Sequence, residues 1–306
     1  MTSTAERTVR DRSRIPQRRG VSRRRVTSRQ PSVRRRRSAT PILGGIFLAG
    51  VCLAMLAPFL WTILSVTKPT NVAFVSPPVL TYEPTMDAFV DLWQATNFYQ
   101  YVLNTFGVAV ISTIVALVIG LPAAYALARA PGYVSAILLI IALVFRALPR
   151  LAVVLPMYEL SRQFGIHDTT LALSAALVAI NQPFSIWLLR NFFVKLPEEV
   201  DEAAMIDGCS RFQALRRVII PMMGPGILTA GVFMFLFAFQ EYLTPLILTD
   251  NQAMTVPLFI ASQLGQTLPM LQQVGAASIL LTLLVVLFAF IAQKYLVSGL
   301  SDGAGK

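Results

Sequence analysis

The most informative stretch of the sequence is residues 190–223, RNFFVKLPEEVDEAAMIDGCSRFQALRRVIIPMM. Pro197 suits the first turn of a helix, where its missing N–H costs nothing. Four carboxylates within residues 198–202 complement the positive end of that helix dipole. Gly208 favours a left-handed closing turn, and Ser210 with Gln213 fits a capping box that starts a second helix. The stretch therefore predicts two short helices joined by a tight turn.

The first of these helices has a surface suited to contact with another protein. Ala203 and Ala204 favour a helix, and their small side chains let another backbone approach closely. The acidic first turn would be repelled by anionic lipid, which argues against a helix that lies on the membrane surface. We therefore expect a protein partner, and a surface helix without a partner is the alternative.

Around this stretch, the 306-residue chain is too apolar for a soluble domain, with 55% hydrophobic and only 13% charged residues. Apolar runs of about 20 residues are the length that crosses the hydrocarbon core of a bilayer. We therefore expect six membrane-spanning helices within residues 41–306. The expected spans cover residues 42–66, 101–127, 134–160, 170–189, 224–248 and 275–295. Residues 190–223 would then form a loop between the fourth and fifth spans.

Positive charge is concentrated at the N-terminus. Residues 1–40 hold 14 of the 26 Lys and Arg, all of them Arg, and almost no large apolar residues, so we expect this tail to be disordered. Arg runs are a weak cue for nucleic acid, but no aromatic residues are interleaved for base stacking. A cytoplasmic tail that fixes orientation and contacts anionic lipid is favoured. With the N-terminus inside, 22 of the 26 basic residues fall on the cytosolic side, which predicts that both termini are cytosolic.

Reactive and metal-binding residues are scarce. The chain has two cysteines, Cys52 and Cys209, and one histidine, His167, so a disulfide framework or a zinc centre is not expected. The sequence has no nucleophile–base set and no phosphate-cradling glycine loop, which argues against an enzyme.

Polar residues inside the expected spans are candidates for a solute path, because they are costly there. Arg146 and Arg150 are one turn apart on the third span and should face the same way, with Glu159 and Glu241 as available counter-charges. Helix-to-helix hydrogen bonding, or Arg side chains that reach the interface, is the alternative. The candidate path residues are Asn181, Gln182, Gln240, Glu241, Tyr242, Arg146 and Arg150, with Phe239 and Trp187 as possible aromatic walls.

Glu202-Ala203-Ala204, then Gly208, then Val218-Ile219-Ile220-Pro221 resembles the signature loop of ABC importer permeases. The family pattern is EAA, three residues, G, nine residues and I-x-L-P. Every spacing fits, and Val218 and Ile220 replace Ile and Leu. The resemblance implies the type I ABC importer permease fold, an all-α membrane protein with six transmembrane helices and a cytosolic coupling helix.

Further matches cover about residues 41–306 and narrow the resemblance to carbohydrate-uptake permeases of the maltose-type inner permease kind. Residues 155–158, LPMY, and 164–166, FGI, are similar to the family's P-L-Y…L-G-L stretch. Residues 183–193, PFSIWLLRNFF, are close to P-F-x-I-W-L-L-R-x-F-F. Residues 295–304, YLVSGLSDGA, are similar to Y-L-V-x-G-L-T-x-G-A. The Arg-rich tail departs from the family's usual short N-terminus.

By this resemblance the chain hydrolyses nothing and holds no cofactor, because ATP and Mg would be bound by a partner ATPase. The resemblance implies a second permease subunit, a dimer of cytosolic ATPase subunits, and an extracytoplasmic solute-binding protein that docks at outer loops 67–100 and 249–274. The solute would be a sugar, oligosaccharide or polyol, and the location the bacterial cytoplasmic (inner) membrane, with lipid and no nucleic acid bound. The residues implied in ATPase coupling are Glu202, Ala203, Ala204, Asp207, Gly208 and Pro221.

Three other interpretations stay open. An ABC permease for glycerol phosphate or an amino acid would use Arg146 and Arg150 for an anion. A secondary transporter would show inverted repeats, and no convincing repeat is visible. A membrane-anchored regulator would depend on residues 1–40, so deletion of this tail would abolish its activity.

Overall fold

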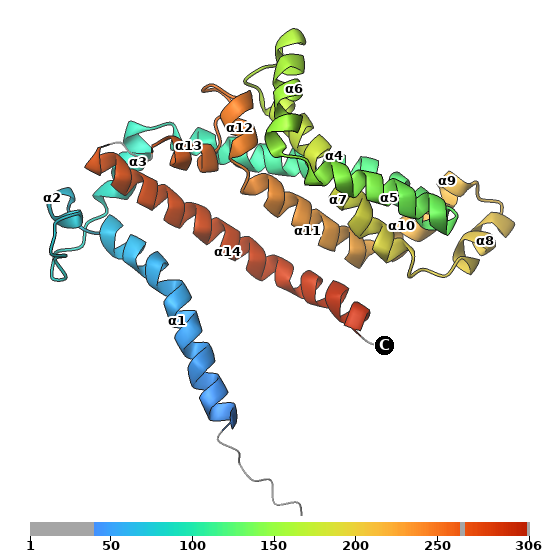
Figure 1. The fold of residues 1–306 in the computed structure, drawn as a ribbon, viewed down its shortest axis with the longest axis horizontal. Coiled ribbons are helices and arrows are strands. Elements are labelled where there is room, and N and C mark those ends of the chain that lie inside the picture. The colour runs from blue at the N-terminus through green and yellow to red at the C-terminus, as the bar shows by residue number, and fades with distance from the viewer. Residues whose placement is uncertain (1–39, 264–266, 305–306) are drawn as a thin grey trace, which may run out of the picture. The chain divides into compact units, whose positions relative to one another are not determined.

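The computed structural model describes residues 40–263 and 267–304, and the regular structure of these residues is entirely helical (Figure 1). The predicted disordered tail, residues 1–40, falls almost wholly outside them. The chain divides into two compact units, residues 1–51 and 52–306. The first unit contributes only the N-terminal part of α1 (Thr40–Val66) to the described residues, and the site lies in the second unit.

Within the described residues, four helices are long and apolar enough to cross a membrane, or up to six if each of two bent helix pairs counts as one span. The four are α1, α4 (Phe98–Arg129), α7 (Thr170–Phe193) and α14 (Leu268–Ala304). They contain the expected spans 42–66, 101–127, 170–189 and 275–295. The membrane-helix class is therefore confirmed, and the count of six depends on the bent pairs.

The expected third span, residues 134–160, is not one helix. It consists of α5 (Gly132–Ala147) and α6 (Arg150–Gln163), which meet at 84°. Leu148 is in extended backbone, as expected for the residue before Pro149. The prediction that Arg146 and Arg150 share one helix face is therefore wrong, because the break separates them.

The expected fifth span, residues 224–248, is also interrupted. Helix α11 (Gly224–Phe239) ends before residues 240–242, and α12 (Leu243–Leu248) follows. At its other end, α11 bends by 82° from the helical segment Arg211–Met222.

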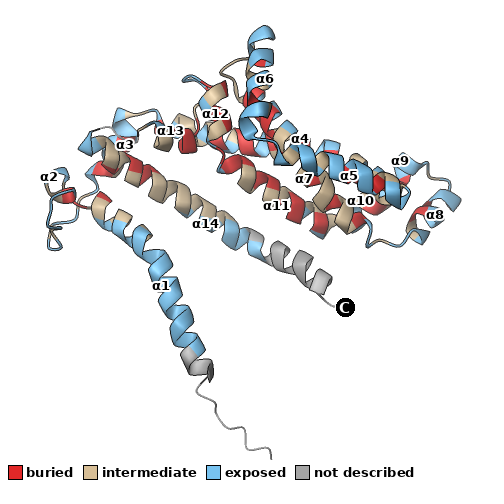
Figure 2. Cartoon of the chain, viewed as in Figure 1, coloured by how far each residue is buried: buried red, intermediate tan, exposed pale blue. Residues whose placement is uncertain are grey.

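The core of the second unit forms where α4 packs against α7 and α11 (Figure 2). Buried Val108, Leu173, Leu177 and Phe235 belong to one cluster there. A Cβ on Gly120 of α4 would lie 2.8 Å from Ser185 Oγ on α7, so a larger residue at this position would force the α7 side chains to shift.

The loops between the long helices contain short helices. The loop 67–100 includes α2 (Thr70–Ala73) and α3 (Asp87–Ala95), and α3 packs against α14. Loop 249–274 includes α13 (Val256–Ser262) and the start of α14. The stretch quoted at the outset, residues 190–223 (below, the decisive segment), forms α8 (Glu199–Ile206), α9 (Arg211–Ala214), the π-helical turn η1 (Leu215–Ile219) and α10 (Ile220–Met222).

Candidate functional site

The predicted turn between two short helices is present, with the expected residues in the expected roles. Gly208 has a φ of +88° and comes after Asp207, the C-cap of α8. Nothing lies within 4 Å of the position a Cβ would take, so backbone conformation selects glycine. Ser210 Oγ accepts the Gln213 N–H at 3.3 Å, and Gln213 Oε1 accepts the Ser210 N–H at 2.9 Å. This reciprocal pair is the predicted capping box.

Two prolines lie near the ends of this segment, and the first stands outside the predicted position. Pro197 precedes α8, whose first residue is Glu199, instead of standing in its first turn. Pro221 lies inside α10, and the chain bends two residues later, at Met223. Pro221 has no N–H to donate within the helix. The hydrogen bonding just before it is irregular, because residues 215–219 form a π-helical turn.

A buried carboxylate ties α8 to the end of α4, and the sequence reasoning did not identify it. Asp201 Oδ2 accepts hydrogen bonds from Arg129 Nε at 2.8 Å and Nη2 at 2.6 Å, and Oδ1 accepts one from the Tyr125 hydroxyl. The side chains of Asp201 and Arg129 are only 9% and 14% exposed. Arg129 also donates to the carbonyl of Leu196, just before α8. These hydrogen bonds tie α8 to the C-terminal end of α4.

The structure separates the candidate coupling residues. Ala204 is 5% exposed and packs inward, whereas Glu202, Ala203 and Asp207 are exposed. Apolar side chains are exposed beside them: Met205, Ile206 and, from α9, Phe212, which are 39%, 85% and 68% exposed. A cavity of about 410 Å³ lined by residues that include Glu198, Glu202 and Arg211 adjoins this surface. The result is a mixed acidic and apolar surface on a fixed helix.

The candidate path residues include an ion pair that joins the two helix breaks. Arg150 donates to Glu241 Oε2, and Glu241 is 7% exposed. Glu241 Oε1 also accepts the backbone N–H groups of Leu243 and Thr244 at the start of α12. Glu241 is thus the predicted counter-charge of Arg150, whereas Glu159 is exposed.

Arg146 stacks on aromatic rings. Its guanidinium carbon is 4.8 Å from the ring centroid of Phe184 and 5.2 Å from that of Phe237. Its Nη1 lies 3.5 Å from Oδ1 of buried Asn181. Among residues 40–263 and 267–291, no carboxylate lies within 4.0 Å of this guanidinium.

Five of the candidate path residues line one of two cavities. Arg146, Arg150 and Gln182 line a cavity of about 480 Å³ between α5, α6 and α7. Gln240 and Tyr242 line a second one of about 450 Å³, together with α13 and α14. Phe239, expected as a possible cavity wall, is 2% exposed and belongs to the core. Trp187 packs on the Phe184 ring at 5.7 Å.

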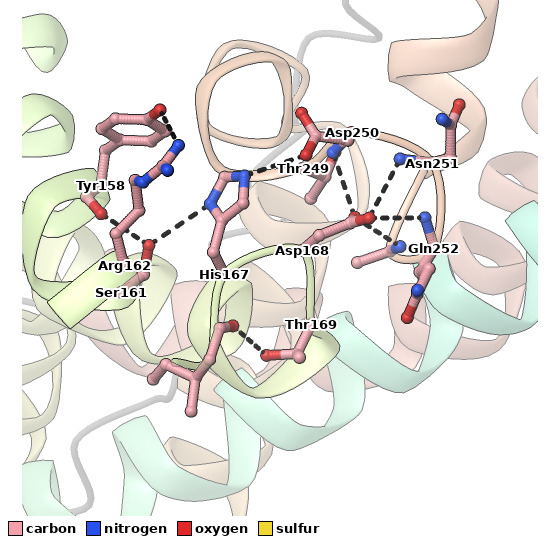
Figure 3. Close-up of polar contacts among 12 residues, drawn as sticks. Tyr158, Ser161, Arg162, His167, Asp168, Thr169, Thr249, Asp250, Asn251 and Gln252 are labelled. Atoms are coloured by element: carbon pink, nitrogen blue, oxygen red, sulfur yellow. Dashed lines mark hydrogen bonds and ion pairs between the residues drawn. The ribbon is translucent and has the colours of Figure 1, made fainter. Parts of the chain in front are cut away.

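A polar cluster near the loops that connect α6 to α7 and α12 to α13 was also missed by the sequence reasoning (Figure 3). Asp168, with a φ of +57°, accepts four backbone N–H groups from residues 250–253 at 3.0–3.2 Å. Burial raises the pKa of Asp168, but these four hydrogen bonds outweigh it and leave the pKa below its ordinary value. Next to it, His167 Nε2 lies 3.3 Å from Asp250 Oδ2. Asp168 therefore fixes the loop that follows α12.

Among the residues that the structure describes, no group of three or more His, Cys, Asp or Glu side chains is placed to hold a metal ion.

Comparisons with known proteins agree with this geometry. Residues 116–302 match the family described as "Binding-protein-dependent transport system inner membrane component". The probable ABC transporter permease protein y4oR of Sinorhizobium fredii is 35% identical, over 88% of this chain and 97% of that protein. The trehalose/maltose transport system permease protein MalG of Thermococcus litoralis is 33% identical, over 87% and 95%.

The fold is also that of a solved transporter. A crystal structure of a bacterial ABC transporter involved in import of the acidic polysaccharide alginate aligns with a TM-score of 0.70 and 20% identity, covering 85% of this chain and 98% of that one. The family match spans the core helices α7 and α11, the α8–α9 turn and part of α4. The chain therefore belongs to the family of binding-protein-dependent transport system inner membrane components, the permease subunits of ABC transporters.

Proposed function

We propose that this chain is a permease subunit that imports a sugar, oligosaccharide or polyol, powered by ATP hydrolysis on a separate dimer of cytosolic ATPase subunits. A second permease subunit would complete the path, and an extracytoplasmic solute-binding protein would deliver the solute. The carbohydrate class is supported by the 33% identical relative that is named for trehalose and maltose. The ATPase and not this chain would hold ATP and Mg.

The observation that carries the coupling role is the rigid attachment of α8 through Asp201. A helix that transmits force must offer a surface to its partner and must be fixed to what it moves. The exposed Glu202, Ala203 and Ile206 supply the surface, and the Asp201–Arg129 pair supplies the attachment. Displacement of α8 would therefore pull on α4, which packs on both α7 and α11.

The proposed roles differ among the candidate coupling residues. Glu202 would meet a basic group on the ATPase, and Ala203 would allow close contact. Ala204 and Gly208 would shape the loop from within, since Ala204 is buried and Gly208 sets the turn. Asp207 would flank the contact, and Pro221 would help to shape the end of the second helical segment, two residues before the bend.

The proposed topology places both termini in the cytosol. The decisive segment 190–223 would then be cytosolic, and the loops held together by Asp168 would face outward. Residues 1–40 would act as a cytoplasmic tail that contacts anionic lipid.

The test is ATP hydrolysis by the complete reconstituted transporter across a panel of sugars and polyols, presented with the binding protein. We expect stimulation by at least one saccharide, and loss of stimulation in Gly208→Asp with normal membrane insertion. Gly165→Asp is a matched control, because Gly165 also has a positive φ (+67°) with nothing within 4 Å of a Cβ and lies outside the coupling segment. Normal uptake by Gly208→Asp would reject the coupling role.

A further inference from the structure

We propose that the cavity between α5, α6 and α7 binds an acidic group of the transported solute, with Arg146 as its ligand, so that the substrate is an anionic saccharide. This inference rests on the proposed function and narrows its substrate class. It starts from the charge balance of the cavity wall. Two guanidinium groups line the cavity, and the surrounding protein neutralises one of them.

Arg150 is the neutralised group. Its charge is paired with Glu241, whose two oxygens are already committed to Arg150 and to the backbone N–H groups at the start of α12. Glu241 therefore has little capacity left to serve a second cation. Arg146, in contrast, has two aromatic faces and one amide oxygen as partners. Among the described residues, Arg146 is thus a cation of the cavity wall with no carboxylate within 4.0 Å.

The neighbours of Arg146 position it without cancelling its charge. Aromatic faces attract a cation through their quadrupole, which fixes the guanidinium plane and leaves its formal charge in place. The contact to Asn181 Oδ1, at 3.5 Å, lies at the long limit for a hydrogen bond. A planar guanidinium with free N–H groups is well suited to bind a carboxylate or sulfate in two places at once.

The rest of the wall suits a sugar ring. The cavity volume of about 480 Å³ lies within the range of small-molecule sites, about 300–1,000 Å³. Apolar Phe145, Pro183 and Ile186 offer surfaces for the C–H faces of a ring, and the Gln182 amide adds a neutral polar group. An apolar wall with a few convergent polar groups is typical of a ligand site.

The depth of the site favours a solute over a lipid headgroup. Asn181, which Arg146 contacts, is the twelfth of the 24 residues of α7, so at 1.5 Å per residue it lies about 17 to 18 Å from either helix end. The hydrocarbon core is about 30 Å thick, and lipid phosphates lie outside it. An anion that reaches this depth is more consistent with a transported molecule.

The experiment uses the complete transporter, with its partner permease, ATPase and binding protein, in vesicles of neutral lipid. Uptake of digalacturonate and sialyllactose is compared with uptake of maltose and trehalose. We expect the wild type to import an acidic probe, and Arg146→Gln to lower the ratio of acidic to neutral uptake about 10- to 100-fold, as expected for loss of a charged hydrogen bond. Arg146→Lys should recover part of that ratio, because it restores the charge without the fork geometry.

Arg162→Gln is the matched control, since it removes an exposed guanidinium from α6, outside the cavity. It should leave the ratio unchanged. Wild-type transport confined to neutral sugars, or an unchanged ratio in Arg146→Gln, would overturn the inference while leaving the proposed function intact. The assay is repeated in vesicles that contain anionic phospholipid. An Arg146→Gln effect that appears only there, and not in neutral lipid, would assign the site to a lipid and also overturn the inference. Failure of every saccharide to drive ATP hydrolysis would reject the proposed function itself.

Discussion

Replacement of Asp201 by alanine should loosen α8 from α4 while leaving the membrane helices folded. Asp201 accepts three hydrogen bonds, two from Arg129 and one from Tyr125, in a site where both charged side chains are largely buried. The neighbouring Glu202 is also acidic but is exposed, so Glu202→Ala is the matched control.

The size of the effect follows from these contacts. Breaking a buried ion pair by removing one partner costs about 3–5 kcal/mol, and the 14% exposure of Arg129 lets water compensate part of that cost. We therefore expect Asp201→Ala to destabilise the attached state of α8 by about 3 kcal/mol. At about 1.4 kcal/mol per factor of ten, the detached population should rise about 150-fold.

Native-state hydrogen exchange of the purified chain measures this population directly, because locally opened amides exchange faster. Protection over residues 199–206 should fall by about two orders of magnitude in Asp201→Ala and remain unchanged in Glu202→Ala. In the complete transporter, both variants should lose solute-stimulated ATP hydrolysis, for different reasons. Unchanged protection of α8 in Asp201→Ala would refute the proposed attachment.

Three further predictions follow from the geometry. Gly208→Ala should destabilise the α8–α9 turn by about 1–2 kcal/mol, because its φ of +88° is unfavourable for any residue with a Cβ. Chemical denaturation against the wild type measures this loss, Gly165→Ala should show a loss of the same kind because its φ is +67°, and stability equal to wild type in Gly208→Ala would contradict the prediction. The folded-state pKa of Asp168 is lowered, so the stabilisation that its carboxylate provides should be complete above its ordinary pKa of about 3.9 and should be lost as the pH falls through the lowered value. Hydrogen exchange of amides 250–253 should therefore accelerate in acid in the wild type. The Asp168→Asn variant should show no such pH step. Arg150→Gln should lower the free energy of unfolding by about 1–3 kcal/mol, because it leaves buried Glu241 unpaired. The double variant with Arg150→Gln and Glu241→Gln should be more stable than the Arg150→Gln and Glu241→Gln losses added together predict, as measured by thermal unfolding. Additive losses would count against the ion pair.

Local sequence rules predicted the parts of the site that depend on neighbouring residues. The turn at Gly208 and the capping box of Ser210 and Gln213 each require residues within a few positions of one another, so they can be inferred from spacing alone. The long apolar helices follow from composition in the same way.

The missed features depend on contacts between distant residues. Asp201 looked like one of several acidic residues in a first helical turn, and only the fold of the chain brings it to Arg129, 72 positions earlier. The four amides that bind Asp168 come from a loop more than 80 positions later. The predicted shared face of Arg146 and Arg150 failed because Pro149, which constrains the residue before it, starts a new helix at 84°.

The most direct measurement is photo-cross-linking from Ala203 in cells that are actively importing solute, with the same label at exposed Phe164 as the control. The account predicts a covalent adduct between position 203 and an ATP-hydrolysing subunit, and none from position 164. Failure to capture such a subunit from position 203, or equal capture from both positions, would contradict the role of α8 as the surface that receives force from ATP hydrolysis.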